Sequence, residues 1–262
     1  MLLLVDAGNT RIKWAALASD QPAAPGQWAQ FGMVARAEIG ALVQAWQTLG
    51  ISRVLLSNVA GAALREELEQ VLAQALAQTL AQTLGFTPVP RLWFKSQAEL
   101  GGVRNAYRDP QQLGCDRFAS AIGARALYPG QALMIVTCGT ATTIDCVSAE
   151  GVFTGGMILP GLSTMAASLA TNTAQLPQVP HAVEIAQAFA DNTTDAIISG
   201  CLNAQAGAIE RALSLYHARH PDARCLMSGG AAHLIAPHLS IPHDKVDNLV
   251  LIGLQTFAFL PE

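Results

Sequence analysis

The sequence predicts an α/β fold in which one strand-rich unit occurs twice. Two stretches carry the repeat, VDAGNTRIKWAAL from Val5 and VTCGTATTIDCVS from Val136. In each, the valine closes an apolar run, a glycine follows three residues later, and a second strand-like segment follows the turn. Composition agrees, because 51% of the 262 residues are hydrophobic and 13% are charged, which suffices for a sizeable core.

The first half begins with a predicted hairpin, because the apolar run LLLVDAG ends in a turn and IKWAAL then resumes. A helix predicted at 62–84 has leucine at every fourth position, from Leu64 to Leu84, which gives it an apolar face. Its AQALAQTLAQTL stretch is typical of a tandem expansion within a helix. The other elements expected in this half are strands at 27–34, 53–58 and 91–94 and a helix at 39–49.

The second half is predicted to repeat this strand order. It follows a helix at 113–127 that is rich in small residues and is broken by Tyr128-Pro129-Gly130. The elements expected are strands at 132–137, 142–148, 151–159 and 224–227, one or two helices within 186–219 with a possible break at Gly200, and a helix at 249–260. We therefore expect two domains, 1–125 and 126–262, with a ligand-binding cleft between them.

Charge and cysteine content argue against several classes of protein. A net charge of −4 without a Lys/Arg cluster argues against nucleic-acid binding. The N-terminal MLLLVDAGN lacks the basic segment of a signal peptide, and the apolar stretches are too short for a membrane span. We therefore expect a cytoplasmic protein with no membrane partner. Five cysteines without a CxxC pair argue against a disulfide framework and against structural zinc.

The first glycine turn carries residue types that suit a phosphate. Backbone N–H groups that converge in a glycine-containing turn bind anions, and Gly8 allows close approach because it has no Cβ. Asn9 and Thr10 add side-chain donors, and Lys13 adds a positive charge. Asp6, at the end of the strand, suits a hydrated Mg²⁺.

The second turn supplies donors again, from Gly139, Thr140, Thr142 and Thr143. Two such turns, one in each half, predict a site that holds a polyphosphate between them. For the first turn alone, an ordinary Asp-Gly-Asn hairpin turn is the alternative. Neither GxxxxGK[ST] nor GxGxxG occurs in the right context, so a nucleotide would be held in another way.

Five motifs resemble those of the type III pantothenate kinase family, also known as the Bvg accessory factor family. In order from Val5 to Leu234 they are VDAGNTRIK, NAYRDPQQLGCDR, TCGTATTID, GGMILPGL and SGGAAHL. The family belongs to the acetate kinase, Hsp70 and actin superfamily. The resemblance implies two ribonuclease-H-like (actin-like ATPase) domains, a homodimer, and transfer of the γ-phosphate of ATP to pantothenate, the first step of coenzyme A biosynthesis.

The resemblance also implies roles for single residues. Asp116 would accept the hydroxyl proton, a base that phosphoryl transfer to an alcohol needs; an Asp favoured by the helix dipole is the alternative. For Arg117, Tyr107 and Thr193 the alternatives to substrate binding are a surface ion pair, a packed aromatic ring and a helix N-cap. The implied substrate-binding residues are Tyr107, Gly114, Cys115, Asp116, Arg117 and Thr193, the last across the dimer interface. The implied ATP-binding and phosphate-binding residues are Asp6, Gly8, Asn9, Thr10, Lys13, Gly139 and Thr140, with Asp6 also holding Mg²⁺ through water.

One position departs from the family pattern. Thr137 stands where the family usually has an Asp that contributes to a monovalent cation site, so a requirement for K⁺ or NH₄⁺ stays open. Two other functions also stay open: a regulatory accessory protein of the same fold with little or no kinase activity, and a superfamily kinase for another small alcohol. Retention of Asp6, Lys13, Asp116 and Arg117 favours catalysis over the first, and NAYRDPQQLGCDR disfavours the second.

Overall fold

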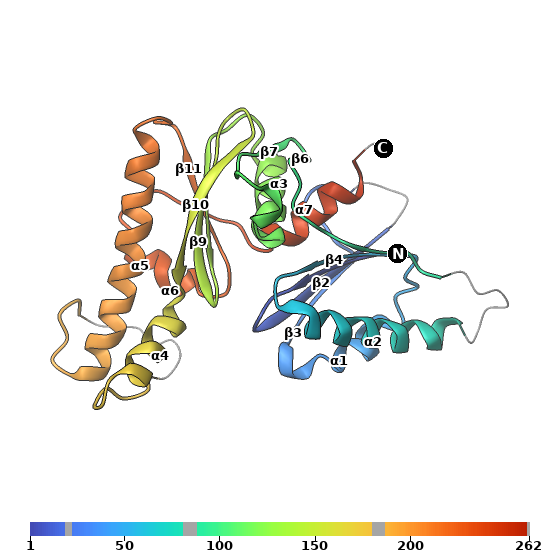
Figure 1. Ribbon diagram of the computed structural model, residues 1–262, viewed down its shortest axis with the longest axis horizontal. Helices are drawn as coiled ribbons and strands as arrows, with labels where there is room; N and C mark the ends of the chain where they lie inside the picture. The colour runs from blue at the N-terminus through green and yellow to red at the C-terminus, as the bar shows by residue number, and fades with distance from the viewer. Residues whose placement is uncertain (19–22, 81–87, 180–186, 261–262) are drawn as a thin grey trace. The chain divides into compact units, whose positions relative to one another are not determined.

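A computed structural model describes residues 1–18, 23–80, 88–179 and 187–260. The chain divides into two compact units, one formed by Met1–Tyr128 with Leu249–Glu262 and the other by Pro129–Asn248. Each unit contains a mixed β-sheet with helices packed against it (Figure 1).

The sheet of the first unit has the strand order β3-β2-β1-β4-β5. β1 is antiparallel to β2 and parallel to β4, while β2 pairs with β3 antiparallel and β4 with β5 parallel. The strands are β1 (Leu2–Ala7), β2 (Arg11–Leu17), β3 (Gln30–Ala35), β4 (Arg53–Asn58) and β5 (Arg91–Trp93).

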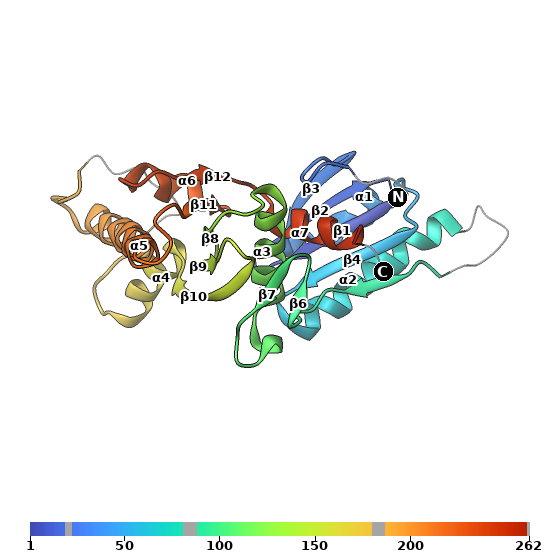
Figure 2. The same cartoon turned by 90° about the horizontal axis from the view of Figure 1, so that it is seen from above.

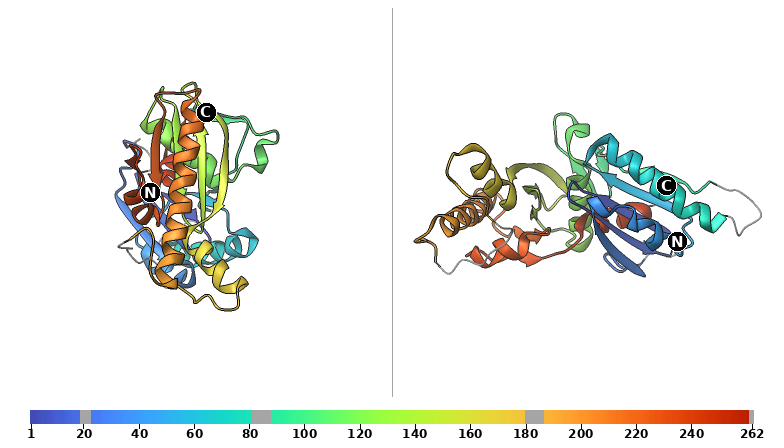
Figure 3. Two further views of the ribbon diagram at one scale, coloured as in Figure 1. Left: turned by 90° about the vertical axis from the view of Figure 1, so that its left-hand side faces the viewer. Right: turned by 90° about the horizontal axis from the view of Figure 1, so that it is seen from below.

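Both faces of this sheet are covered, which explains the continuous apolar run at the start of the chain. Leu3, Val5 and Ala7 belong to a core shared with α1 (Ala41–Trp46) and α2 (Gly61–Leu80). The alternate residues of β1, Asp6 among them, point to the other face. There α7 (Leu249–Ala258) contacts β1 and β4, and α3 (Cys115–Leu127) contacts β4. Figure 2 shows α7 over the sheet, and the right-hand view of Figure 3 shows α2 on its opposite side.

The second unit repeats this topology. Its strands follow the order β12-β11-β8-β9-β10, with β8 antiparallel to β9 and parallel to β11. They are β8 (Leu133–Cys138), β9 (Ala141–Val147), β10 (Val152–Pro160), β11 (Arg224–Ser228) and β12 (Asp244–Lys245). Its helices are α4 (Leu162–Asn172), α5 (Thr193–His217) and α6 (Ala232–Ile235). The predicted α/β fold with a repeated strand-rich unit is therefore confirmed.

Several elements differ from the sequence prediction. α5 runs without a break through Gly200, and α4, α6 and β12 were not predicted. A short hairpin of β6 (Glu99–Leu100) and β7 (Val103–Asn105) was also not predicted, nor were the 3₁₀ turns η1 (Arg36–Glu38), η2 (Pro110–Gln112) and η3 (Ala236–His238). The predicted helical residues 81–84 and 186 lie outside the described residues.

The C-terminal helix belongs to the first compact unit. α7 packs closely on α3, because a Cβ on Gly253 would lie 1.8 Å from the carbonyl oxygen of Ala119. The predicted division at 125–126 places this helix in the second half instead. As a statement about folded domains, that division stays a prediction. Among the helices of the described residues, none is long and apolar enough to cross a membrane.

Candidate active site

Asp6 lies at the polar end of β1, with two polar neighbours on adjacent strands. In the antiparallel register its Cα partner is Lys13, and in the parallel register it is Ser57. Burial raises the pKa of the Asp6 carboxyl from 3.8 to about 7, while Lys13 lowers it and the nearby Asp116 raises it further. The sheet thus places a carboxyl group, a lysine side chain and a hydroxyl group side by side on one face.

Asp116 lies in the first turn of α3, on the same side of the sheet as Asp6. Its Oδ1 accepts a hydrogen bond of 2.8 Å from the backbone N–H of Arg117. Burial raises the pKa of Asp116, and this hydrogen bond and the charge of Arg117 oppose the shift. A Cβ on Gly114 would lie 2.7 Å from Asp116 Oδ1, so the glycine leaves room for the carboxylate to fold back over the helix start.

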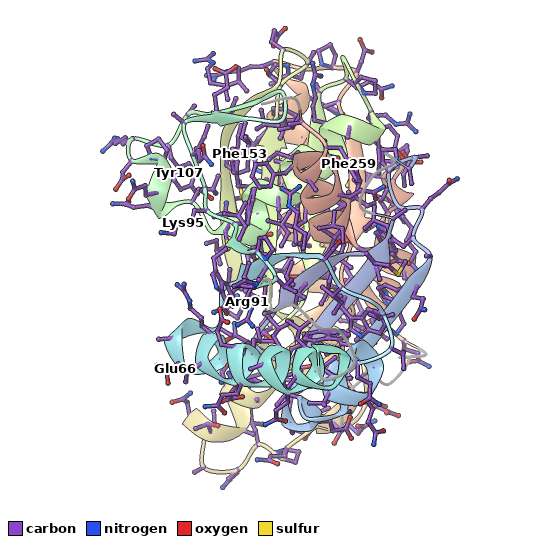
Figure 4. All side chains as sticks on the ribbon, turned by 90° about the vertical axis from the view of Figure 1, so that its right-hand side faces the viewer. Glu66, Arg91, Lys95, Tyr107, Phe153 and Phe259 are labelled. Carbon is purple, nitrogen blue, oxygen red and sulfur yellow. The ribbon has the colours of Figure 1, made fainter. Side chains whose placement is uncertain are left out.

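Arg117 points into the first unit and contacts Tyr107. Its residue is 7% exposed, and its Nη1 donates a hydrogen bond of 3.0 Å to the hydroxyl of Tyr107. The guanidinium also lies 5.8 Å from the Tyr107 ring centroid. Figure 4 shows Tyr107 on the segment between β7 and α3. The alternative of a surface ion pair at Arg117 is therefore wrong.

The first glycine turn is tightly closed. The N–H of Gly8 donates to the carbonyl of Arg11 at 3.1 Å, and the carbonyl of Thr10 accepts from Arg36. A Cβ on Gly8 would lie 3.2 Å from the Arg11 carbonyl oxygen. The N–H of Gly8 thus closes the turn. Gly8 can therefore contribute to ligand binding by letting the backbone approach the ligand closely, since it has no Cβ.

Two glycines from distant parts of the chain pack against the second turn, residues 138–140. A Cβ on Gly161 would lie 2.0 Å from the carbonyl oxygen of Gly139, and one on Gly229 would lie 2.3 Å from that of Cys138. The N–H of Gly161 and the hydroxyl of Thr164 donate to the carbonyl of Thr140, at 2.9 and 2.7 Å. The motifs TCGTATTID, GGMILPGL and SGGAAHL therefore meet at one turn in the second unit.

Strand register shows what corresponds to Asp6 in the second unit. Thr137 holds the matching place in β8, with Thr143 on the antiparallel strand and Ser228 on the parallel strand. The row Asp6–Lys13–Ser57 of the first unit is thus replaced by three neutral hydroxyls. The two turns therefore have the same backbone plan and different charge.

The predicted site residues are divided between the two units. Asp6, Lys13, Cys115, Asp116 and Arg117 gather in the first unit, whereas Gly139, Thr140 and Thr193 lie in the second. Thr193 is exposed and is the first residue of α5, whose N-cap is Asn192, so the N-cap alternative for Thr193 is wrong. Ser57 was missed, although RVLLSN, like LLLVDAG, ends a buried strand with polar residues.

The repeated sheet and the two glycine turns define a two-domain α/β protein with the fold of the acetate kinase, Hsp70 and actin superfamily. Solved structures with this fold include a Baf family protein from Campylobacter jejuni, with a TM-score of 0.57 and 18% identity over 97% of this chain and 96% of that one. Another is the ethanolamine utilization protein EutJ from Carboxydothermus hydrogenoformans, with a TM-score of 0.51 and 13% identity over 98% of this chain and 88% of that one.

The chain belongs to the type III pantothenate kinase family, whose model matches residues 2–214. A type III pantothenate kinase from Janthinobacterium sp. (strain Marseille) is 60% identical over 98% of this chain and 97% of its own length. Another, from Herminiimonas arsenicoxydans, is 58% identical with the same coverage. The family resemblance predicted from five motifs is thus confirmed.

Proposed function

We propose that this chain transfers the γ-phosphate of ATP to the hydroxyl of pantothenate, which yields 4′-phosphopantothenate and begins coenzyme A biosynthesis. The observation that carries the proposal is 60% identity, over nearly the whole length, to a type III pantothenate kinase. The arrangement of Asp6, Lys13 and Asp116 in the first unit supports it, because phosphoryl transfer depends on positioned charge and a proton acceptor.

Asp116 acts as the general base in this proposal. Its carboxylate is held at the start of α3, and burial moves its pKa upward, which makes it a better proton acceptor near neutral pH. Arg117 and Tyr107 form the pantothenate-binding group with Gly114 and Cys115 beside them. The guanidinium suits the carboxylate of the substrate, because it offers two parallel donors.

The phosphates of ATP are held by the two glycine turns. Gly8, Asn9, Thr10 and Lys13 serve in the first unit, and Gly139 and Thr140 in the second. Among the described residues, no three His, Cys, Asp or Glu side chains gather as a metal cage. Asp6 nevertheless fits Mg²⁺ through water, because Mg²⁺ bound with phosphates commonly uses one or two carboxylates. When bound, the ion supplies positive charge against the phosphate oxygens.

An ADP-release assay tests this function. We expect ADP release to depend on pantothenate and not on a panel of other small alcohols. Asp116→Asn should reduce kcat about 10²-fold or more while ATP and pantothenate binding, measured by calorimetry, stays near normal. Unchanged turnover in this variant would show that Asp116 is not the general base. ADP release with another alcohol, and none with pantothenate, would show that pantothenate is not the substrate.

The neutral hydroxyls of Thr137, Thr143 and Ser228 affect the response that we expect to monovalent cations. A threonine offers one hydroxyl and no charge, so we expect kcat/KM to change little when K⁺ or NH₄⁺ replaces choline as the counter-ion. Thr137→Asp should introduce a response to K⁺, because a carboxylate then stands at the place of β8 that matches Asp6. Strong activation of the native chain by K⁺ would contradict this assignment.

The assembly and location of the enzyme complete the proposal. We place it in the cytoplasm as a homodimer in which Thr193, exposed at the start of α5, contacts substrate bound to the partner subunit. Sedimentation equilibrium checks the dimer. Mixing Thr193→Val with Asp116→Asn chains checks the shared site, because mixed dimers then contain one site free of both substitutions.

A further inference from the structure

Ser57 links the strand beside Asp6 to the helix that carries Asp116. It lies at the end of β4, is the parallel-register partner of Asp6, and is 1% exposed. A buried hydroxyl needs a hydrogen-bond partner. Its Oγ lies 3.4 Å from Sγ of Cys115, the first residue of α3. A side-chain contact therefore connects the end of β4 with the start of α3.

The direction of each hydrogen bond follows from proton counting. Sγ of Cys115 also lies 3.5 Å from the backbone carbonyl oxygen of Asn58. A carbonyl only accepts, so the single thiol proton is directed to it, and the Ser57 hydroxyl donates to the sulfur. The chain of donors runs from Ser57 O–H to Cys115 S–H to Asn58 C=O, and it ties α3 to two consecutive residues of β4.

This joint lies beside two carboxyl groups that interact electrostatically, those of Asp6 and Asp116. Asp116 follows Cys115 directly, and its charge reaches Asp6, whose pKa it raises. Burial also raises the pKa of Cys115, so the thiol keeps its proton and adds no third negative charge beside the two acids. A neutral pair of hydrogen-bonding groups can therefore hold the helix start without adding to the repulsion.

We propose that Ser57 and Cys115 are positioning residues that hold Asp116 at its working distance from Asp6 through the Ser57–Cys115–Asn58 hydrogen bonds. The assignment rests on the proposed kinase activity, because it gives the joint the task of placing the general base. Ser57 itself needs no contact with substrate. A shift of α3 by a fraction of an ångström would misplace the carboxylate relative to the hydroxyl that it deprotonates.

Ser57→Ala tests the joint with a matched control. We expect kcat to fall about tenfold while KM for ATP and for pantothenate changes less than about twofold, because only the placement of the base is lost. Ser96→Ala removes another buried serine hydroxyl of the first unit, one without a hydrogen-bond partner among the described residues, and should leave kcat unchanged. Equal kcat values for the two variants would overturn the proposal.

Variants at Cys115 show whether kcat depends on the hydrogen bonds of this side chain or on its volume. Cys115→Ala should lose kcat as Ser57→Ala does, and the double variant should lose no more than about twice either single loss, because both break one joint. Cys115→Ser keeps a donor and should restore kcat to within about threefold of the native value. Equal losses in Cys115→Ser and Cys115→Ala would contradict a role for the donor.

The Asp116→Asn background shows whether Ser57 acts through the base. There, Ser57→Ala should change the residual kcat by less than about twofold, because the base it positions is gone. A full tenfold loss in this background would overturn the proposal.

A readout without substrate separates this inference from the proposed function. In urea unfolding at pH 8, the coupling between Asp6→Asn and Asp116→Asn measures the repulsion of the two carboxylates. Ser57→Ala should reduce this coupling, as α3 moves, even in a chain without activity toward pantothenate. An unchanged coupling would overturn the positioning role.

Discussion

Asp6 lies between the buried Val5 and Ala7 of β1, with Lys13 across the ladder and Asp116 nearby. Its pKa of about 7, against an ordinary 3.8, means that near pH 5.5 the folded chain holds a proton that the unfolded chain has released. The free energy of unfolding therefore falls as pH rises from about 4 to 7. The full shift corresponds to a loss on the order of 4 kcal/mol.

Asp6→Asn should remove this pH-dependent cost. Without nucleotide or metal, the variant should be more stable than the native chain at pH 8, and the difference should disappear near pH 4, where both side chains are neutral. Urea unfolding at one-unit steps from pH 4 to pH 8 measures the difference. A gap that stays constant across this range would show that burial of the carboxylate is not its cause. The gain should come with a loss of turnover, since a strained site trades stability for function.

At the scale of elements, α3 and α7 pack with unusually close backbones. A Cβ on Gly123 would lie 2.4 Å from the carbonyl oxygen of Leu249, and one on Gly253 would lie 1.8 Å from that of Ala119. Real side-chain atoms do not approach so closely, so the two helices rely on glycine at the crossing. The same contact supports the site, because α3 carries Asp116 at its first turn.

Gly253→Ala should separate α3 from α7 and destabilise the chain by more than about 2 kcal/mol, as overpacking in a rigid core does. Gly207→Ala is the matched control, because Gly207 lies in α5 with open space around its Cβ position. That change should stabilise by about 0.5–1 kcal/mol through helix propensity. Thermal unfolding measures the stability of both variants. A Gly253→Ala variant as stable as the native chain would show that the helices can move apart without cost.

At the scale of the whole molecule, Gln255 of α7 connects the C-terminal helix with residues 23–28. Its Oε1 accepts from the N–H of Gly26 and from Nε1 of Trp28, at 2.9 and 3.0 Å. Its Nε2 donates to the carbonyls of Ala23 and Ala24. Gln255 is 2% exposed, and these hydrogen bonds satisfy both the oxygen and the nitrogen of its amide within the first unit.

Gln255→Ala should lower the stability of the first unit by about 1–3 kcal/mol, because it removes four hydrogen bonds, two of them from the half-buried N–H of Gly26 and indole of Trp28. Tryptophan fluorescence is a selective probe, since Trp14, Trp28, Trp46 and Trp93 all belong to this unit. The midpoint of urea unfolding followed by fluorescence should fall. Gln44→Ala, at an exposed position of α1, should leave it unchanged, and equal midpoints for the two variants would contradict the anchoring role.

Much of the fold was predictable because apolar runs end at the polar residues of the turns. β1, β4 and β8 each combine a fully buried run with a polar residue near the carboxyl end, so strand and site were predicted together. α4 gave no such signal. Its sequence LSTMAASLATN has small and polar residues throughout, and Leu162 is its buried residue. Two-residue strands such as β12 are too short for any period to show.

The contacts within the site were less predictable than its residues. Asp6, Asp116 and Arg117 carry chemistry that their residue types reveal. The close approaches of Gly161 and Gly229 to the second turn join segments far apart in sequence, and a glycine alone does not tell which backbone it touches. Ser57 was missed for the same reason, because its role depends on a sulfur 58 positions later.

The placement of α7 affects the order in which the protein is made. Residues 129–248 are synthesised before Leu249–Ala258, so the N-terminal unit waits on the ribosome for roughly 10 s with the α3 surface around Ala119 and Gly123 uncovered. The second unit, which is continuous in sequence, can fold during this delay. The first unit is therefore the first to be translated and the last to be completed.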